Sequence, residues 1–251
     1  MKLFHTDLDN TIIYSYKHSI GSEKRCVEIY REREVSFITD RTYALLKEIK
    51  KIVTVVPTTT RTVEQYRRID LGTGPFSYAL AANGGILLVN GEEDALWYQE
   101  SLAAISESRE ELVFGERLLE KDKNRCMEVR DIRGLFAFTK SEKPLDSVKR
   151  LKESLDMDKV DVFGNGVKVY IVPKKLNKGT AVLRLKERLR PEAVIAAGDS
   201  AFDVPMLNCA DLAIAPAELS GEKGLSDQVR CMTGRKLFSE ELLAYIKKFP
   251  F

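Results

Sequence analysis

The chain has 251 residues, of which 44% are hydrophobic, so it is long enough to bury a sizeable core in one large or two modest domains. Its 40 Lys and Arg residues nearly balance 38 Asp and Glu, and this balance argues against a nucleic acid or an anionic membrane as the partner. Because the sequence has neither an apolar run of the roughly 18–20 residues that span a bilayer nor the apolar stretch of a signal peptide, we expect a cytoplasmic protein.

Short apolar runs alternate with amphipathic helical stretches in the first part of the chain. An apolar run at 3–6 precedes a helix expected at about 40–51, and a second run at 52–56 precedes another helix. The alternation returns near the C-terminus, where a helix expected at 177–189 precedes a run of small apolar residues at 193–197. This order predicts an α/β fold with a parallel sheet flanked by helices.

Residues 26–37, between the first strand and the first helix, alternate apolar and polar side chains around a charged turn at 31–34. The pattern predicts a hairpin within about 14–38. Arg31 or Arg33 at its tip has two readings, a contact with a nearby site or ordinary solvation, and solvation is the commoner one at a hairpin tip. Alternation alone leaves open whether the hairpin closes over a site.

The pattern changes between the two α/β parts. Four short apolar runs there are typical of strands, and they surround two polar helices; the runs cover 126–129, 135–138, 160–163 and 167–172. We therefore expect a core domain formed by 1–97 and 174–251, interrupted by an α+β domain at 98–173.

The clearest chemical signal is the sequence Asp7-Leu8-Asp9-Asn10-Thr11, directly after the first apolar run. Open α/β sheets place their ligand sites at the carboxyl ends of parallel strands. Asp7 and Asp9 can face one crevice there, where one attacks phosphorus and the other handles the proton of the leaving group. The same residues are also typical of a local turn, since Asp and Asn bond readily to nearby backbone.

A second acidic segment follows the run at 193–197, where Gly198 leads to Asp199, Ser200 and Asp203. Carboxylates brought close together repel one another unless a cation lies among them. A small set of oxygen donors suits Mg²⁺, which keeps several of its waters. Ser200 and Asp203 have a second reading as helix-capping residues.

Two further segments carry side chains that suit a phosphoryl group. Lys178 stands at the start of an expected helix, where the helix dipole disfavours a cation, so either a phosphoryl group lies beside it or it is a solvated surface lysine. Thr58 and Thr59 follow the run at 52–56, and one is expected to cap the next helix while the other donates to a phosphoryl oxygen. Arg61 is either a phosphate ligand or a surface charge.

Taken in order along nearly the whole chain, these segments resemble the motifs of the haloacid dehalogenase superfamily. The family pattern of strand-DxDxT, strand-Ser/Thr, Lys and GDxxxD is met by Asp7–Thr11, by Thr58 or Thr59, by Lys178, and by Gly198–Asp203. The resemblance implies a Rossmann-like core with a parallel sheet, and an inserted α+β cap domain.

One segment also suggests the subgroup. Leu80–Gly85 resembles the Asn-Gly segment of the Cof-like and sucrose-phosphate-phosphatase-like members, which carry the type IIB cap. Asn83 is therefore a candidate substrate-binding residue, although a tight turn explains it equally well. Asn10 replaces a commoner glycine and Phe202 a common asparagine, which puts a match to one named substrate family in doubt.

By this resemblance, the chain is a phosphatase that hydrolyses a small phosphorylated metabolite, such as a sugar phosphate, through an aspartyl-phosphate. Asp7 is implied as the nucleophile and Asp9 as the general acid and base. The implied ligands of Mg²⁺ are Asp7, Asp9 through its carbonyl, Asp199, and Asp203, which is alternatively a brace for Lys178. The phosphoryl group is implied to bind Lys178 and Thr59, with Thr58 as the second choice.

Two other functions stay open at this point. A phosphomutase of the same fold would return the phosphoryl group to its substrate and release no phosphate. A non-catalytic module that binds phosphorylated metabolites is also conceivable, because Asn10 and Phe202 depart from the usual pattern. Phosphate release from an aryl phosphate, with and without Mg²⁺, separates these readings.

Overall fold

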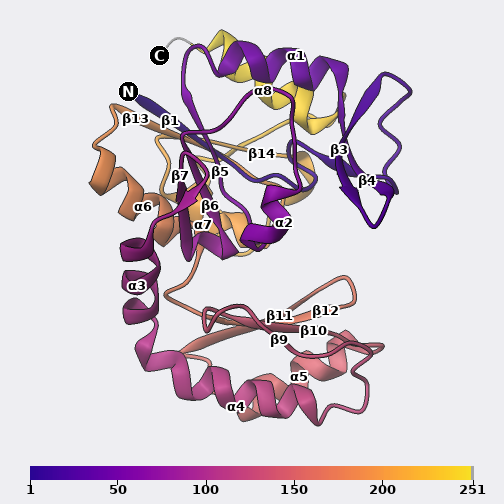
Figure 1. The fold of residues 1–251 in the computed structure, drawn as a ribbon, viewed down its shortest axis with the longest axis vertical. Coiled ribbons are helices and arrows are strands. Elements are labelled where there is room, and N and C mark those ends of the chain that lie inside the picture. Colours follow the sequence, from indigo (N-terminus) through magenta and orange to yellow (C-terminus); the bar gives the residue numbers. More distant parts are fainter. Residues whose placement is uncertain (250–251) are drawn as a thin grey trace. The chain divides into compact units, whose positions relative to one another are not determined.

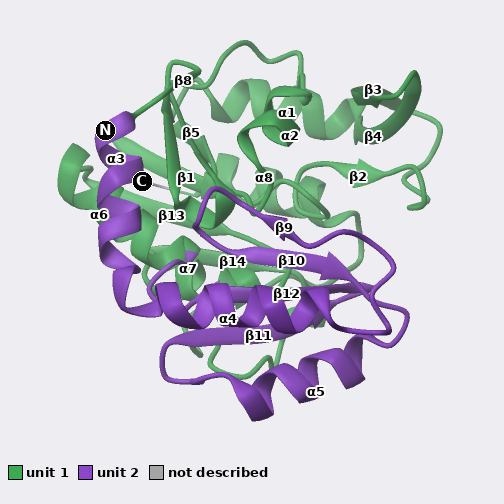
Figure 2. Ribbon diagram, turned by 60° about the horizontal axis from the view of Figure 1, so that its bottom comes forward, with its two compact units in different colours: residues 1–94, 178–251 green, residues 95–177 purple. Residues whose placement is uncertain are grey.

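The computed structural model describes residues 1–249 and divides the chain into two compact units. The core unit comprises Met1–Asp94 together with the segment that begins at Lys178, and the inserted unit comprises Ala95–Asn177 (Figure 2). These divisions fall within a few residues of the boundaries expected after 97 and after 173. The predicted fold class, an α/β core with an inserted α+β segment, is confirmed.

A parallel sheet of five strands forms the centre of the core unit (Figure 1). The strands pair in the order β15 (Arg230–Cys231), β14 (Leu212–Ala215), β13 (Ala193–Ala197), β1 (Lys2–Thr6) and β5 (Thr54–Pro57). Thr6 lies opposite Ala197 on one side and Pro57 on the other. Three neighbouring strands therefore end at the same level, and the residues that follow them meet at one edge of the sheet.

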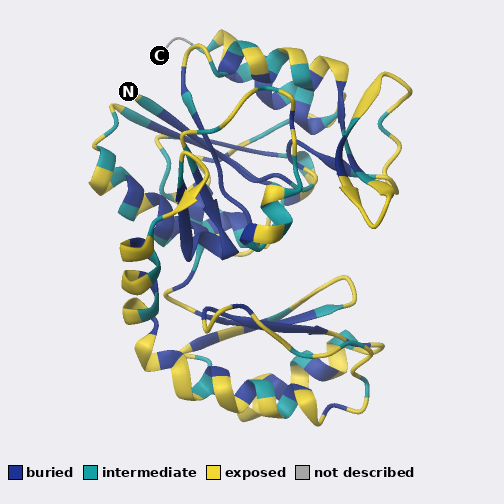
Figure 3. Ribbon diagram, in the orientation of Figure 1, coloured by how far each residue is buried: buried dark blue, intermediate teal, exposed yellow. Residues whose placement is uncertain are grey.

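Helices cover both faces of this sheet, which explains why its central strands are apolar throughout. On one face, α1 (Asp40–Ile49) and α8 (Phe238–Lys248) pack Leu46 and Leu242 into a core with Phe4 and Ile195. On the other face, α6 (Lys178–Leu189) and α7 (Val204–Asn208) pack against alternate residues of the same strands, including Val194 and Ala196. Figure 3 shows the central strands buried along their lengths.

Two small antiparallel sheets complete the core unit. The first contains the expected hairpin, formed by β3 (Lys24–Tyr30) and β4 (Arg33–Thr39), with β2 (Tyr14–Ser15) on the other side of β4. The second contains β6 (Tyr78–Ala81), β7 (Ile86–Val89) and β8 (Glu92–Glu93), with a 3-10 turn at Ala82–Gly84 between β6 and β7. Helix α2 (Val63–Arg67) lies between the two in sequence.

The inserted unit is an antiparallel sheet with helices packed on one face. The sheet order is β11 (Val160–Asn165), β12 (Lys168–Pro173), β10 (Ala137–Lys140) and β9 (Arg130–Asp131). Helices α4 (Arg109–Glu120) and α5 (Pro144–Ser154) bury Leu112 and Leu151 against it, and α3 (Ala95–Ala104) precedes them. None of the helices within residues 1–249 has the length and apolar character that crossing a bilayer requires.

One predicted strand of the inserted unit is wrong. Residues 126–129 do not form a strand, and the edge of the sheet is β9 at Arg130–Asp131. The hydroxyl of Thr139 donates to the carbonyl oxygens of Met127, at 2.6 Å, and of Glu128, at 3.3 Å. The backbone N–H of Cys126 still donates to Lys140 O at 2.9 Å, and a side chain is the partner of the next two carbonyls.

Candidate active site

The aligned strand ends bring the first two motifs together. The backbone N–H of Asp7 donates to Ala197 O at 2.9 Å, and that of Thr58 donates to Thr6 O at 2.8 Å, so the parallel ladder continues one residue beyond each strand. Asp7 and Thr58 are therefore fixed by backbone pairing with the neighbouring strands. The pairing of the sheet alone sets these two positions, without a bound ligand.

Lys178 joins the helix start to two of the expected carboxylates. Its side chain is 1% exposed, and its ammonium lies 2.5 Å from Asp7 Oδ1 and 2.6 Å from Asp203 Oδ1. Burial thus excludes the reading of Lys178 as a solvated surface lysine, and the anions beside it in this structure are two carboxylates of the protein.

The charged groups around Lys178 shift one another's pKa values. Burial alone would lower the pKa of the Lys178 ammonium, but the carboxylates of Asp203 and Asp7 outweigh it and raise that pKa above its ordinary value. Burial raises the pKa of Asp7; Lys178 opposes this rise, and the neighbouring carboxylates add to it. The Lys178 ammonium therefore stays charged. Its single positive charge does not balance the negative charges of the neighbouring carboxylates.

Asp203 holds the turn after β13 in shape. Its Oδ2 accepts hydrogen bonds from the backbone N–H of Asp199 at 3.1 Å, and from Ser200 N and Oγ at 3.0 and 2.9 Å, while its Oδ1 pairs with Lys178. A Cβ on Gly198 would overlap the side chain of Asp203, so only glycine fits there. Asp203 thus acts as a capping residue and as a brace for Lys178, which combines two expectations from the sequence.

Asp199 is half-buried, whereas Asp7 and Asp203 are buried. Thr11 Oγ1 donates to its Oδ1 at 3.2 Å. Burial and the nearby carboxylate of Asp203 raise the pKa of Asp199 to about 6, and Lys178, Asn10 and Thr11 reduce the rise. Asn10 has a φ of 58°, in the left-handed region where Gly and Asn are favoured, which explains how it substitutes for the commoner glycine.

The carboxylates of Asp7, Asp199 and Asp203 form a compact group of oxygen donors. One oxygen from each lies within 4.8 Å of the others. Among residues 1–249, the ammonium of Lys178 is the one cation within hydrogen-bond distance of these carboxylates, and it contacts two of them. A divalent cation that prefers oxygen ligands fits this arrangement, because it supplies the missing charge and these donors leave positions for water or a phosphoryl oxygen.

The two threonines after β5 have different environments. Thr58 Oγ1 donates to Val56 O at 3.1 Å and lies 3.0 Å from His5 Nδ1, so its hydroxyl is engaged inside the core. Thr59 Oγ1 accepts the backbone N–H of Arg61 at 3.1 Å, which leaves the hydroxyl proton available to a ligand. Burial lowers the pKa of His5 to about 3, so this imidazole is neutral and belongs to the core.

Asp9 pairs with Arg61, a contact that was not predicted from the sequence. Arg61 Nε donates to Asp9 Oδ2 and Arg61 Nη2 to Asp9 Oδ1, both at 2.7 Å. Its third nitrogen lies 2.9 Å from Oε2 of Glu28, a residue of β3 that is 3% exposed. Arg61 is thus not a free surface charge, because its guanidinium pairs with the carboxylates of Asp9 and Glu28. Sequence analysis missed Glu28 entirely, although an acidic residue amid an apolar-alternating strand was a usable signal.

Asn83 lies in the 3-10 turn between β6 and β7. It is buried and has a φ of 58°, and its backbone N–H donates to Thr59 O at 3.0 Å. The structure therefore places Asn83 next to the backbone of Thr59, as a turn residue that supports the motif. Its role in binding substrate remains a proposal.

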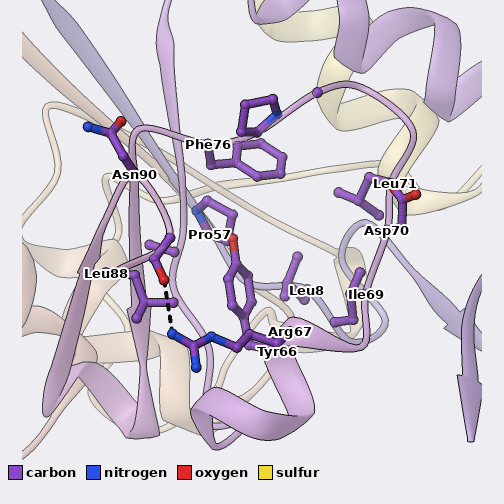
Figure 4. Close-up of a pocket in the computed structure, with 14 residues that line it drawn as sticks. Leu8, Pro57, Tyr66, Arg67, Ile69, Asp70, Leu71, Phe76, Leu88 and Asn90 are labelled. Atoms are coloured by element: carbon purple, nitrogen blue, oxygen red, sulfur yellow. Dashed lines mark hydrogen bonds between the residues drawn. The ribbon is translucent and has the colours of Figure 1, made fainter. Parts of the chain in front are cut away.

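A cavity of about 420 Å³ lies beside α2 in the core unit (Figure 4). Its walls include Leu8, Pro57, Tyr66, Phe76 and Leu88, and Tyr66 points into it from α2. Arg67 beside it donates to Gly91 O at 3.0 Å. Because the carboxylates of the site do not line this cavity, it is not where a phosphoryl group would bind.

Gly179 sets how closely α6 approaches α7, and with it the position of Lys178. A Cβ at Gly179 would overlap the backbone carbonyl of Pro205. We expect Gly179→Ala to lower the free energy of unfolding by about 1–3 kcal/mol, despite the better helix propensity of Ala, because backbone must move to make room. Chemical denaturation measures this loss.

The matched control is Gly164→Ala in the inserted unit. A Cβ there meets its nearest neighbour, Lys168 O, at an ordinary contact distance of 3.7 Å. We expect this variant to stay within about 1 kcal/mol of the parent. Equal stability of Gly179→Ala and the parent would show that the α6–α7 contact is not tight.

Comparison with known proteins identifies the family and the fold. Residues 4–220 match the model of the haloacid dehalogenase-like hydrolases. A curated relative, the phosphoglycolate phosphatase of Methanopyrus kandleri, is 32% identical over 143 residues, which cover 55% of this chain and 58% of that protein. The chain thus aligns with little more than half the length of this relative.

Solved structures show the same fold over nearly the whole chain. The sucrose-phosphatase of Synechocystis sp. PCC6803, in complex with sucrose and phosphate, has a TM-score of 0.68 at 18% identity, with 97% of this chain and 96% of that chain covered. The Thermoplasma acidophilum protein 0175 has a TM-score of 0.58 at 18% identity, with 98% and 97% covered. The resemblance to the sucrose-phosphate-phosphatase-like subgroup is thereby confirmed at the level of fold, and the chain belongs to the haloacid dehalogenase-like hydrolases.

Proposed function

We propose that this chain is a Mg²⁺-dependent phosphatase that hydrolyses a small phosphorylated metabolite through an aspartyl-phosphate on Asp7. The observation that carries the proposal is the buried group of Asp7, Asp199 and Asp203, with the ammonium of Lys178 at 2.5 Å from Asp7 and 2.6 Å from Asp203. Such a site can quench the negative charge that gathers when a carboxylate attacks a phosphoryl group. The relatives named phosphoglycolate phosphatase and sucrose-phosphatase support this class of reaction.

In the first step, an oxygen of Asp7 forms a bond to phosphorus while the bond from phosphorus to the leaving-group oxygen breaks. Asp9 gives a proton to that oxygen, so an alcohol leaves and an aspartyl-phosphate stays. In the second step, Asp9 takes a proton from water, the water oxygen bonds to phosphorus, and the bond to Asp7 breaks. Phosphate leaves and the Asp7 carboxylate is restored, so the sum is hydrolysis of one phosphomonoester by one water.

The other residues serve binding and charge. Mg²⁺, held by Asp7, Asp199 and the carbonyl of Asp9, would supply positive charge to the phosphoryl oxygens. Lys178 neutralises one further negative charge, and Asp203 fixes the position of that ammonium. Thr59 is the better candidate to donate to a phosphoryl oxygen, because the hydroxyl of Thr58 is engaged with Val56 and His5.

The proposal is tested by phosphate release from a panel of phosphorylated metabolites that includes 2-phosphoglycolate and sucrose phosphate. With Mg²⁺ present we expect turnover of at least one compound, and with EDTA a loss of about 100-fold or more, reversed when Mg²⁺ is restored. The loss follows because three carboxylates with a single ammonium otherwise repel an incoming phosphomonoester.

Three other outcomes contradict the proposal in different ways. Transfer of the phosphoryl group back to substrate, without phosphate release, would show a phosphomutase. Binding of the panel without any chemistry, with or without Mg²⁺, would show a non-catalytic module. Equal turnover in EDTA and in Mg²⁺ would remove the metal from the mechanism.

A further inference from the structure

We propose that Arg61 and Glu28 are positioning residues that hold the carboxylate of Asp9 for proton transfer, so that the β3–β4 hairpin supports catalysis through Glu28. The inference rests on the proposed function, in which Asp9 is the general acid and base. It concerns the core unit alone and four side chains that pair in an alternating series of charges, Asp9, Arg61, Glu28 and Arg68.

The contact between Arg61 and Asp9 has the geometry that fixes a carboxylate. The two bonds of 2.7 Å, from Nε to Oδ2 and from Nη2 to Oδ1, form a fork that restrains rotation of the carboxylate about its own axis. The Asp9 side chain is 48% exposed, and within residues 1–249 its carboxylate has no other hydrogen-bond or ion-pair partner. Without Arg61, a half-exposed Asp9 would sample several rotamers.

Arg61 is itself held from the opposite side. Its side chain is 14% exposed, and Nη1 lies 2.9 Å from Glu28 Oε2. Glu28 also accepts from Ser36 Oγ at 2.7 Å and from Arg68 at 3.0 Å. Burial raises the pKa of Glu28, but the bonds from Ser36, Arg61 and Arg68 outweigh it and hold that pKa below its ordinary value. Glu28 is thus an ionised anchor for the guanidinium of Arg61.

The hairpin is shaped to bring Glu28 inward. Glu28 pairs with Ser36 across the hairpin, and the register of β3 shifts on both sides of Glu28. Such an irregularity redirects a side chain, and it is over-represented next to active sites. Glu28 also forms an isolated bridge with Ile69, which ties β3 to the segment after α2.

Net stability is a weak explanation for a buried carboxylate at position 28. A buried ion pair contributes little net stability compared with apolar residues of similar size, because both charges must lose their water. A charged group kept buried at this cost, two contacts away from Asp9, is better explained by what it holds. The fork on Asp9 is the feature that an apolar residue at position 28 would weaken.

If Asp9 loses its position, the loss in kcat/KM should depend on the leaving group of the substrate. Asp9 must protonate an alkoxide as it departs, whereas the nitrophenolate of p-nitrophenyl phosphate leaves without help. The value of kcat/KM reports the steps up to formation of the aspartyl-phosphate, so it is insensitive to the later hydrolysis step in which Asp9 acts again. A merely structural defect would lower kcat/KM for both kinds of substrate alike.

Two conservative variants test the proposal, on p-nitrophenyl phosphate and on the best alkyl phosphate of the panel. Arg61→Lys keeps the charge and loses the fork, and we expect kcat/KM for the alkyl phosphate to fall about 30-fold, but less than about 3-fold for the aryl phosphate. Glu28→Gln keeps the shape and loses the charge, and we expect the same selectivity with a smaller loss of about 5-fold. Glu34→Gln, an exposed acid on the same hairpin, is the matched control and should change neither value.

A double-mutant cycle with Asp9→Asn makes the test independent of folding. If Arg61 acts through Asp9, Arg61→Lys has no further effect on the alkyl phosphate once Asp9 is Asn. Equal losses of kcat/KM on both substrates would overturn the inference, and so would a full loss of about 30-fold in addition to that of Asp9→Asn. In either case, turnover by the wild-type chain would still uphold the proposed function. A wild-type chain that releases no phosphate from either substrate would instead overturn the proposed function, and the positioning role with it.

Discussion

Asp7→Asn is expected to abolish turnover and to leave the fold intact. The amide has the shape of the carboxylate but cannot supply the anionic oxygen that attacks phosphorus, so the aspartyl-phosphate cannot form. We expect a loss of at least about 10⁴-fold in kcat, as for the removal of other covalent nucleophiles. Phosphate release, and the absence of phosphorylated protein after acid quenching, measure the effect.

The structure indicates why the fold should survive this change. Lys178 keeps its contact with Asp203 at 2.6 Å, so its buried ammonium is not left unpaired. The backbone bond from position 7 to Ala197 O is unaffected by the side chain. Asp227→Asn, the same change at an exposed position, is the matched control and should keep full activity. Full activity in Asp7→Asn itself would end the covalent mechanism.

The convergence of the motifs is the part of the site that the sequence could predict. Asp7, Thr58 and Gly198 each follow a strand of one parallel sheet, and parallel strands in register place the following residues at one edge. Lys178 was recognisable because a cation at a helix start needs a nearby anion, and Asp7 and Asp203 provide two. These inferences depend on backbone order alone.

The roles that depend on side-chain packing were not predictable. The family resemblance ranked Thr59 ahead of Thr58, but the contacts that separate them, from Thr58 Oγ1 to Val56 O and His5 Nδ1, come from packing. Arg61 was interpreted from the sequence as a phosphate ligand or a surface charge, and its pairing with Asp9 and Glu28 was not predicted. The alternation over residues 26–37 predicted the hairpin, but a register shift beside Glu28 leaves no pattern of its own in the sequence.

The inserted unit likewise has features that the sequence predicts and features that it does not. The change from helix–strand alternation to clustered short strands predicted an insertion at 98–173, and the compact inserted unit comprises Ala95–Asn177. The strand expected at 126–129 failed, because Thr139 takes the carbonyls of that segment with its hydroxyl. The spacing of apolar residues indicates a strand, but it does not indicate where a side chain bonds to a backbone carbonyl in place of a neighbouring strand.

Lys178→Met is expected to remove activity and stability together. In its place a thioether would lie beside Asp7 and Asp203, whose carboxylates would then be buried close together without a cation. Breaking a buried ion pair from one side costs about 3–5 kcal/mol, and we expect a loss of that size in Mg²⁺-free denaturation. Turnover should fall at least about 10³-fold, because the phosphoryl group also loses its ammonium.

Lys186→Met is the matched control on the same helix. Lys186 is more than a third exposed, and its 3.5 Å contact with Asp211 lies at the surface, where ion pairs contribute little. This variant should keep both its stability and its turnover. A Lys178→Met protein as stable as the parent would show that the two carboxylates do not depend on the ammonium for their burial.

A second substitution separates the two roles of Lys178. In Lys178→Met with Asp203→Asn, the amide oxygen can still accept the bonds from Asp199 and Ser200 that Asp203 Oδ2 accepts now, and the NH₂ group replaces a negative charge beside Asp7. We expect this double variant to regain most of the lost stability and to stay inactive. Stability would then depend on neutralising the buried charge by any means, whereas catalysis requires a cation at the position of Lys178. Recovery of turnover in the double variant would contradict that separation.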